Sequence, residues 1–292
     1  MNRFTFALAA LLTVAALPAS AERIVAVGGS VTEIVYALGA GDQLVGVDTT
    51  SLFPAKTEAL PKVGYLRALT AEGLLTLRPE LILAAQEAGP ASALTQVGQA
   101  GVKTAMIGVD LLPGSIADRI RAVGAALGKS AQAEAMATAF ADDLATITAA
   151  AGRTPKRAKV LFLLSASSGS ILASGRRTAA DAIIEAAGGA NAISGYEGYK
   201  PASAEAVAMA DPDVILMTSQ TFDAIGGIDK IRKLPGVLAT RAAREDRVIR
   251  FESGYLLGLG PRTAHAVRDL AQALAPDAPL PALPARPWTR AE

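Results

Sequence analysis

The chain has 292 residues, a net charge of +1, 51% apolar residues and 19% charged residues, so it can bury a substantial core and is not expected to be disordered. It contains no cysteine and one histidine, which excludes disulfides, thiolate metal sites and iron–sulfur clusters and removes most zinc enzymes. The near-neutral charge, with no basic block, gives no electrostatic basis for binding nucleic acid.

Residues 1–21 have the pattern of an export signal. A basic start at Arg3 precedes an almost unbroken apolar run from Phe4 to Leu17, and Ala19-Ser20-Ala21 supplies small residues for a cleavage site. The apolar run is too short to span a bilayer, and no cysteine follows that could carry a lipid. We therefore expect cleavage after Ala21 and a protein that is soluble in a bacterial periplasm.

The next segment alternates short apolar strands with helices. After the first strand, Gly28-Gly29 ends the apolar run, Ser30 is a suitable helix N-cap, and Glu33 completes a capping box three residues later. Alternation of strand and helix at this spacing predicts a parallel sheet covered by helices. The predicted strands are Ile24–Val27, Leu44–Val47, Leu81–Ala84 and Thr104–Ile107.

A long helical segment and a second alternating region follow. The helical segment runs from about Ser115 to Ala151 with a break at Gly128, and its second half contains neither glycine nor proline. Further strands are predicted at 160–164, 214–217 and 248–251, and a closing helix at 263–274.

The fold class expected from this order is α/β, with two Rossmann-like lobes that contain parallel sheets and are joined by one long interlobe helix. The expected segments are a signal peptide (1–21), an N-terminal α/β lobe (22–128), the interlobe helix (129–152), a C-terminal α/β lobe (153–280) and a proline-rich tail (281–292).

The two lobes contain related sequence segments. Each has a Gly-Tyr pair, and from Thr70 and Ser203 onward the two segments align without a gap. In each, Thr or Ser is placed to cap a short helix two residues before Glu72 or Glu205, and a Pro-acidic turn leads into a buried strand. This pattern predicts a structural repeat.

Few residues are placed for catalysis. Ser165–Ser168 forms a serine cluster at a strand end, but it lacks the G-x-S-x-G pattern of a nucleophile elbow. The single histidine, His265, falls on the polar side of the predicted helix 263–274, so we expect its side chain to be solvated. A secreted serine hydrolase that uses the serine cluster stays open as an alternative of another class.

Tyr65 is the strongest candidate for a ligand-binding residue. It follows Gly64 in a predicted loop between two elements of the first lobe, and a cation, Arg67, lies two residues further on. A phenolate is a hard anionic donor that suits Fe(III), and haem ligation by tyrosine is an established mode. If the segment is extended, residues 65 and 67 share a face, and Arg67 then favours the phenolate form.

Four segments, residues 63–72, 173–181, 198–201 and 256–263, resemble those of periplasmic haem-binding proteins that feed bacterial haem ABC importers. The wider class includes vitamin B12 and siderophore binders with two lobes bridged by one helix. The resemblance implies a non-enzymatic, monomeric carrier that captures haem between its lobes and delivers it to an inner-membrane permease dimer. It also implies an outer-membrane haem receptor upstream. A siderophore or corrinoid binder of the same fold is the alternative.

The resemblance also implies roles for individual residues of the first lobe and of the repeat. The family's axial iron ligand falls on Tyr65 and its neighbouring cation on Arg67. The carboxylates that such proteins offer to their permease fall on Glu72 and Glu205.

The second lobe departs from the pattern of some relatives. Where those relatives have a further histidine ligand, this chain has Ser165–Ser168, and where they direct an arginine at the tyrosine it has Met217–Gln220. Whether Arg176, Arg177 or Tyr199 takes over this contact is open, and these three residues complete the expected haem-binding set.

Overall fold

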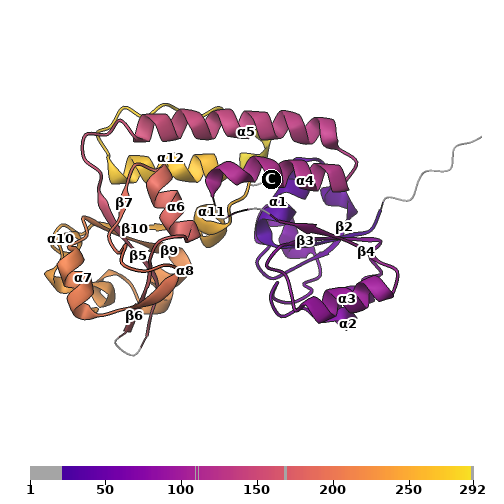
Figure 1. Ribbon diagram of the computed structural model, residues 1–292, viewed down its shortest axis with the longest axis horizontal. Coiled ribbons are helices and arrows are strands. Elements are labelled where there is room, and N and C mark those ends of the chain that lie inside the picture. Colours follow the sequence, from indigo (N-terminus) through magenta and orange to yellow (C-terminus); the bar gives the residue numbers. More distant parts are fainter. Residues whose placement is uncertain (1–21, 109, 111, 168–169, 291–292) are drawn as a thin grey trace, which may run out of the picture.

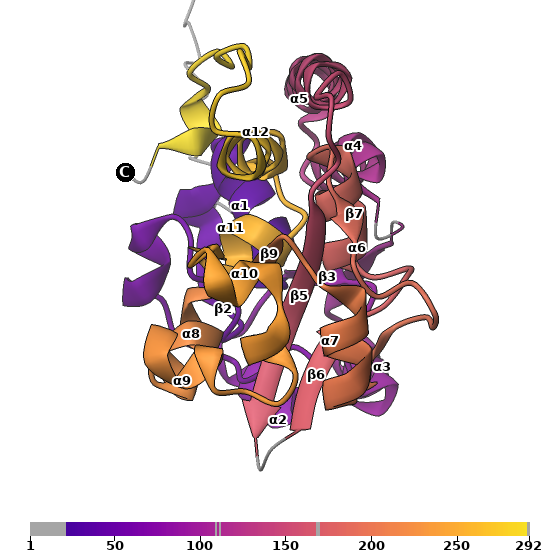
Figure 2. The same cartoon turned by 90° about the vertical axis from the view of Figure 1, so that its left-hand side faces the viewer.

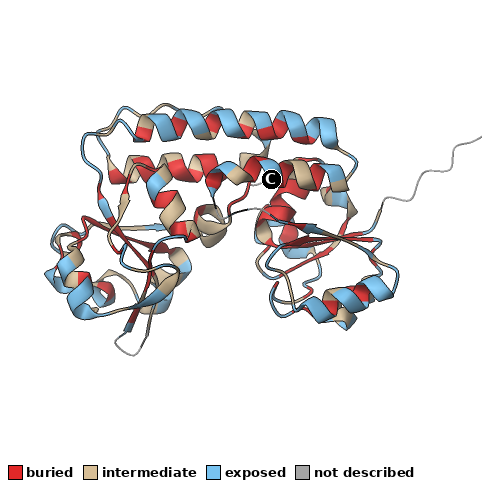
Figure 3. Cartoon of the chain, in the orientation of Figure 1, coloured by how far each residue is buried: buried red, intermediate tan, exposed pale blue. Residues whose placement is uncertain are grey.

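The computed structural model describes residues 22–290, apart from 109, 111, 168 and 169, and forms two α/β lobes (Figure 1). The expected export signal lies outside the described residues. Buried residues concentrate in the two sheets and between the helices that connect the lobes (Figure 3). Within the described part of the chain, no helix is long and apolar enough to cross a membrane.

The N-terminal lobe contains a four-stranded parallel sheet in the order β2-β1-β3-β4. All residues of β1 and β3 are buried, as expected for central strands covered by helices on both faces. The strands are β1 (Ile24–Val27), β2 (Leu44–Val47), β3 (Leu81–Ala85) and β4 (Lys103–Ile107). The helices are α1 (Gly29–Ala37), α2 (Ala71–Thr76), α3 (Ala91–Gln99) and α4 (Ile116–Ala126), with short 3₁₀ turns at Gly41–Gln43, Ala55–Ala59 and Pro113–Ser115.

The C-terminal lobe contains a six-stranded mixed sheet. Its strands are β5 (Lys159–Ser167), β6 (Ser170–Ser174), β7 (Ala190–Asn191), β8 (Tyr199–Ala202), β9 (Val214–Thr218) and β10 (Val248–Phe251). The order is β10-β9-β5-β6-β8, and β7 pairs with the start of β5. The expected parallel arrangement is confirmed for β5, β9 and β10, whereas β6 and β8 are antiparallel additions. Only two residues separate β5 from β6, a spacing that permits antiparallel pairing alone.

Seven helices are described in and after this lobe: α6 (Ala179–Ala186), α7 (Ala204–Ala210), α8 (Ser219–Ile225), α9 (Ile228–Arg232), α10 (Arg241–Arg244), α11 (Ser253–Leu257) and α12 (Thr263–Leu274). Two 3₁₀ turns, η4 (Val237–Ala239) and η5 (Pro287–Thr289), complete the second half of the chain.

The predicted long helix is α5 (Ser130–Ala151), which spans both lobes along one side of the molecule (Figures 1 and 2). It follows α4 after the expected break at Gly128 and packs against both α4 and α12. The α4–α5 contact is close, because a Cβ at Gly124 would lie 2.1 Å from the Cβ of Ala133. Buried Phe140 and Ile147 extend this apolar contact along the helix.

The proline-rich residues 281–290 pack against the body of the protein. Leu283 and Trp288 join the hydrophobic core, and η5 contacts α1 of the N-terminal lobe. Arg286 donates two hydrogen bonds to the buried carboxylate of Asp143 in α5. The chain therefore returns from the C-terminal lobe to the N-terminal lobe after α12.

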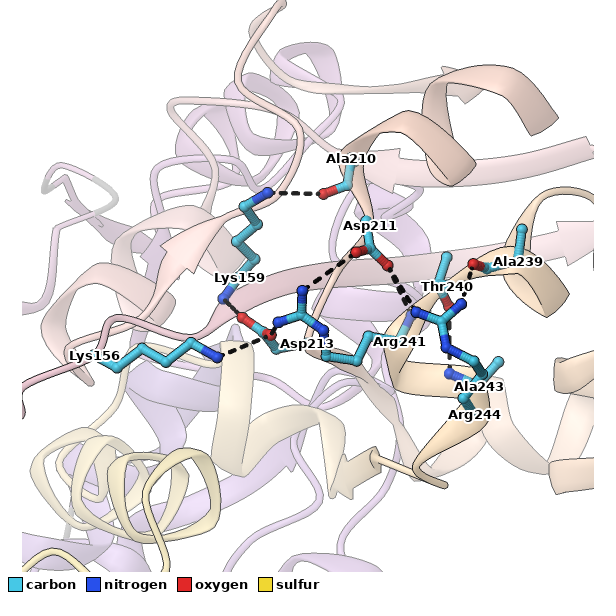
Figure 4. A network of polar contacts seen from close by, with 10 residues as sticks. All are labelled: Lys156, Lys159, Ala210, Asp211, Asp213, Ala239, Thr240, Arg241, Ala243 and Arg244. Carbon is cyan, nitrogen blue, oxygen red and sulfur yellow. Dashed lines mark hydrogen bonds and ion pairs between the residues drawn. The ribbon is translucent and has the colours of Figure 1, made fainter.

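A polar network fixes the amino-terminal edge of the second sheet (Figure 4). The carboxylate of buried Asp213 accepts a hydrogen bond from the backbone N–H of Lys159 at 2.9 Å and contacts the side chains of Lys156 and Arg241. Asp211 accepts a hydrogen bond from the backbone N–H of Arg241 at 2.8 Å. These contacts hold the starts of β5 and β9 together. The carboxyl ends of the two strands lie at the opposite edge of the sheet, away from this network.

Candidate functional site

The carboxyl ends of parallel strands from both lobes border one cleft of about 380 Å³. Open α/β sheets bind their ligands outside this edge. The first lobe contributes the segments that follow β1, β2 and β3, among them Ser30, Thr50, Phe53, Arg67 and Glu87. The second lobe contributes the segments that follow β9 and β10, among them Gln220, Glu252, Leu257 and Arg262.

Tyr65 lies on a loop beside this cleft, and 48% of its surface is exposed. Its neighbours Leu66 and Arg67 line the cleft. The backbone around it is held firmly: Thr49 N–H donates to Gly64 C=O at 2.9 Å, and Gly89 N–H donates to Leu66 C=O at 2.8 Å. Gly64 has φ +102°, a conformation that favours glycine. A fixed backbone thus presents an exposed phenol at the edge of the cleft.

The segment after Tyr65 turns and is not extended. The N–H of Ala68 donates to the C=O of Tyr65 at 2.8 Å, which closes a turn over Leu66 and Arg67. Residues 65 and 67 would share a face only in an extended segment, so that part of the prediction does not hold here. Arg67 is nevertheless brought to the cleft, where it supplies a positive charge next to the Tyr65 loop.

The start of α1 differs from the predicted capping box. The helix begins at Gly29 with Gly28 as N-cap, and no side chain caps it. Ser30 therefore lies within the helix and not at its N-cap, and both Ser30 and Glu33 are buried. Gly28 packs against β3, where an added Cβ would lie 2.8 Å from the Cβ of Ala85. The capping-box prediction is therefore wrong, and Glu33 has a different partner.

That partner is Arg262, at the start of α12 in the second lobe. Its guanidinium donates from Nε and Nη2 to the two carboxylate oxygens of Glu33, at 2.9 and 2.7 Å. Both side chains are buried, and both line the cleft. Burial raises the pKa of the Glu33 carboxyl, while the hydrogen bond and charge of Arg262 oppose this shift. The floor of the cleft is thus a buried ion pair between the lobes.

Two aromatic rings adjoin this ion pair. The Cζ atom of Arg262 lies 3.7 Å from the centre of the Phe53 ring and 5.3 Å from that of Tyr255. The hydroxyl of Tyr255 donates to Asp269 at 2.8 Å. The pKa of the Tyr255 phenol is raised, mainly by burial and further by this hydrogen bond. Sequence reasoning assigned no role to Phe53 or Tyr255. The only sequence signal for this part of the site was the family resemblance of segment 256–263, in which Arg262 lies.

Arg176 and Arg177 line a different hollow, of about 740 Å³. It lies between the segment that precedes α4, represented by Asp110 and Leu112, and the start of α6. Arg176 is 3.8 Å from Glu197, and the backbone N–H of Arg177 donates to Asp181. The structure thus places these two arginines between the lobes but does not bring them together with Arg67.

Tyr199 is the first residue of β8 and is partly buried against the core of its lobe. Its ring centre lies 6.3 Å from that of Phe162. Burial raises the pKa of the Tyr199 phenol, which disfavours the phenolate. The repeated Gly-Tyr pair therefore produces an exposed phenol in the first lobe and a packed one in the second.

Glu72 and Glu205 occupy equivalent positions in the first turns of α2 and α7, and both are exposed. The predicted caps are confirmed: the hydroxyl of Thr70 accepts from Gly73 N–H and that of Ser203 from Ala206 N–H, each at 3.1 Å. Both helices lie on the side of the lobes that faces away from α5 (Figure 1).

The surroundings of His265 do not match the expected solvated helix face. Its Nε2 lies 3.3 Å from the C=O of Pro284, and its Nδ1 is buried without a partner among the described residues. The returning C-terminal segment covers part of this histidine and leaves its ring half-buried, which sequence periodicity within one helix could not reveal. Of the serine cluster, Ser165 lies in β5 and is exposed, and Ser168 lies outside the described residues.

No group of three or more His, Cys, Asp or Glu side chains that could hold a metal ion occurs among the described residues. The chemistry available at the cleft is the exposed phenol of Tyr65 at its edge, the guanidinium of Arg67, and a floor formed by the Glu33–Arg262 ion pair with the ring of Phe53 against it.

Comparisons with known proteins agree with this architecture. Residues 24–255 match the model of the periplasmic binding protein family. The periplasmic haem-binding protein RhuT from Roseiflexus sp. RS-1, solved in apo form, is 39% identical, with a TM-score of 0.85 over 89% of this chain and 100% of that chain. The periplasmic haem-binding protein BhuT in complex with two haems is 41% identical, with a TM-score of 0.82 over 87% of this chain and 97% of that chain.

Two curated relatives belong to the same context. The ABC transporter substrate-binding lipoprotein YvrC of Bacillus subtilis (strain 168) is 27% identical over 88% of this chain and 81% of its own. The vitamin B12-binding protein of Vibrio vulnificus (strain YJ016) is 37% identical over a shorter stretch, 32% of this chain and 34% of its own. The chain belongs to the periplasmic binding protein family, whose members are substrate carriers and not enzymes.

Proposed function

We propose that this protein captures haem in its interlobe cleft and delivers it to an inner-membrane ABC permease. The observation that carries the proposal is similarity at 39–41% identity, over nearly the whole folded chain, to two solved haem-binding periplasmic proteins. The exposed phenol beside the cleft supports it independently, because it offers a donor that suits ferric haem.

Tyr65 is the proposed axial ligand. Coordination by Fe(III) favours the anionic phenolate, and Arg67 on the same loop adds a positive charge. Other donors are weaker candidates: the Nε2 of His265 faces the C=O of Pro284 outside the cleft, and thioethers are softer donors that suit Fe(III) less well. Because Tyr65 is exposed and its backbone is fixed, the phenol can meet a ligand without rearrangement of the loop.

The second-lobe contacts are a separate part of the proposal. Tyr199 is packed against its own lobe, so we assign it a role in shaping the cleft wall and not in bonding iron. Arg176 and Arg177 line the neighbouring hollow and are placed to attract the carboxylates of a ligand that extends into it.

Delivery requires a partner, and the repeat offers one acidic contact on each lobe. Glu72 and Glu205 are exposed at equivalent positions, so a permease dimer could meet each of them with a basic residue of one subunit. We further propose export through the signal at residues 1–21, function as a monomer in the periplasm, and supply of haem by an outer-membrane receptor.

Titration with hemin tests the function. We expect a 1:1 complex with a tyrosinate-type ferric spectrum, whose charge-transfer band is lost in Tyr65→Phe and kept in Tyr199→Phe. The Phe variants keep the ring and remove only the oxygen, so both should fold. Loss of the band in Tyr199→Phe alone would move the ligand to the second lobe, and no hemin binding by the unaltered protein would refute the function.

A corrinoid binder is the second candidate, because one stretch of the chain resembles vitamin B12-binding proteins. Such a ligand would not need the Tyr65 oxygen. Adding cyanocobalamin before hemin separates the two candidates. A haem carrier should bind hemin as well with cyanocobalamin present as without it. A corrinoid carrier should bind cyanocobalamin, and its Tyr65→Phe variant should bind cyanocobalamin equally well.

A further inference from the structure

The loop at residues 258–262 of the second lobe is held at two points by the first lobe. Arg119 of α4, which is 4% exposed, donates from Nη1 to the C=O of Leu259 at 2.6 Å. Arg262, at the end of the same loop, donates to Glu33 of α1. Gly260 lies between them, and an added Cβ would lie 3.0 Å from Glu33 Oε2. Two contacts with the first lobe, one to α4 and one to α1, thus fix this loop at the cleft floor.

Burial of this ion pair is costly, so stability alone is a weak reason for its presence. Taking a carboxylate and a guanidinium out of water costs several kcal/mol for each ion, and replacement of such a pair by apolar residues is often neutral or stabilising. What the pair supplies in return is geometry. The planar guanidinium, held by two parallel hydrogen bonds, can adopt only one orientation relative to Glu33.

The ring of Phe53 packs against the oriented guanidinium of Arg262. The Arg262 Cζ atom is 3.7 Å from the centre of the Phe53 ring, which is a stacking distance. Phe53 belongs to the first lobe and Arg262 to the second, and both line the cleft. An aromatic side chain of one lobe is therefore in stacking contact with a cation of the other.

We propose that Arg262 is a positioning residue that, through Glu33 and Phe53, holds the floor and one aromatic wall of the cleft in place for a flat aromatic ligand. This inference rests on the proposed haem-carrier function and deepens it. A macrocycle ligated by Tyr65 gains contact area and residence time when the ring of Phe53 is fixed against it. Arg262 then contributes to retention of the ligand without touching the iron.

The test compares two arginine–carboxylate pairs, each with a buried carboxylate that accepts two hydrogen bonds from one guanidinium. In Glu33→Leu/Arg262→Met the cleft pair is replaced by apolar side chains of similar size. In the control, Asp143→Leu/Arg286→Met, the same exchange is made on α5 and the C-terminal segment, where the pair does not line the cleft. The measurements are the melting temperature and the rate at which hemin passes to an excess of apomyoglobin.

We expect the cleft variant to melt close to the unaltered protein and to release hemin about tenfold faster or more, which corresponds to at least ~1.4 kcal/mol. The control should release hemin at a rate within about twofold of the unaltered protein. Phe53→Leu should reproduce the faster release. Adding it to the cleft variant should increase the rate little further, because Arg262 acts through Phe53.

A folded cleft variant that releases hemin at the unaltered rate would overturn the proposal and leave the pair a purely structural role. If the double variant does not fold, Arg262→Lys decides the matter, since it keeps the charge and loses the planar fork. Unaltered release by folded Arg262→Lys would also overturn the proposal. Failure of the haem function itself would look different, because the unaltered protein would then bind no hemin.

Discussion

Asp143 in the interlobe helix accepts hydrogen bonds from Nε and Nη2 of Arg286, each at 2.8 Å. The two residues are 143 positions apart, and only 6% of the Asp143 side chain is exposed. Just beyond Arg286, Trp288 joins the core beside α1 of the first lobe. The bond therefore anchors a segment that ties the end of the chain to both α5 and the N-terminal lobe.

Removal of the guanidinium in Arg286→Ala should lower the free energy of unfolding by about 1–3 kcal/mol, because it leaves the buried carboxylate of Asp143 without its partner. The loss should lie below that of a fully buried pair, since a quarter of the Arg286 side chain is exposed. Urea unfolding measures it. Arg290→Ala, at an exposed position four residues on, is the control and should change stability by less than about 0.5 kcal/mol. Equal effects would contradict the anchoring role.

The buried carboxyl of Glu33 should make stability depend on pH. Burial raises its pKa above the ordinary value of 4.5, against the opposing effect of Arg262. The folded chain then binds this proton more tightly than the unfolded chain does. Its contribution to stability is present below the unfolded pKa and is lost as pH rises through the folded pKa. From about pH 4 upward, the unaltered protein should therefore lose stability relative to Glu33→Gln, as measured by the difference between their free energies of unfolding. Urea unfolding at a series of pH values tests this, and a pH-independent difference would show that Arg262 cancels the effect of burial.

Elements whose signal is local could be predicted from the sequence. The strands at Ile24–Val27, Leu44–Val47 and Val248–Phe251 and the helix at Thr263–Leu274 have the expected bounds, because apolar runs and helical periodicity were sufficient to define them. The caps of the repeat were also predictable, since Thr70 and Ser203 bond to residues three positions on.

The features that sequence reasoning missed depend on contacts between distant residues. Glu33 fits a capping box locally, yet its partner Arg262 lies 229 positions away. His265 is on the polar side of its helix, yet the chain returns to it at Pro284 and covers part of its ring. In the candidate site, the neighbouring positions of Tyr65 and Arg67 in the sequence were enough to place both at the cleft, because one loop with a hydrogen-bonded backbone carries them. The second-lobe residues Arg176 and Arg177 could not be placed, because their position depends on how the two lobes pack.

Charge reversal at the proposed docking carboxylates should separate delivery from capture. Glu72→Lys/Glu205→Lys should abolish hemin transport by the cognate permease in proteoliposomes and leave hemin affinity unchanged, because both residues are exposed on α2 and α7 and neither lines the cleft.

The matched control for docking is Glu58→Lys/Glu245→Lys, which makes the same change in charge at one exposed residue of each lobe. It should transport hemin normally. Transport at the unaltered rate by the Glu72/Glu205 variant would restrict these two carboxylates to their helix N-termini, where negative charge is favourable in any case.

The arrangement of the connections between the lobes predicts small motion on ligand binding. Three connections between the lobes would have to deform in a hinge movement. They are the uninterrupted helix α5, the Glu33–Arg262 pair at the cleft floor, and the C-terminal segment held by Asp143. Small-angle scattering with and without hemin should therefore show a change in radius of gyration below about 1 Å. The Asp143→Leu/Arg286→Met protein keeps the first two contacts and should behave in the same way, so α5 and the cleft pair would be sufficient for rigidity. A decrease larger than about 1 Å in the unaltered protein would mean that the lobes close on their ligand despite these connections.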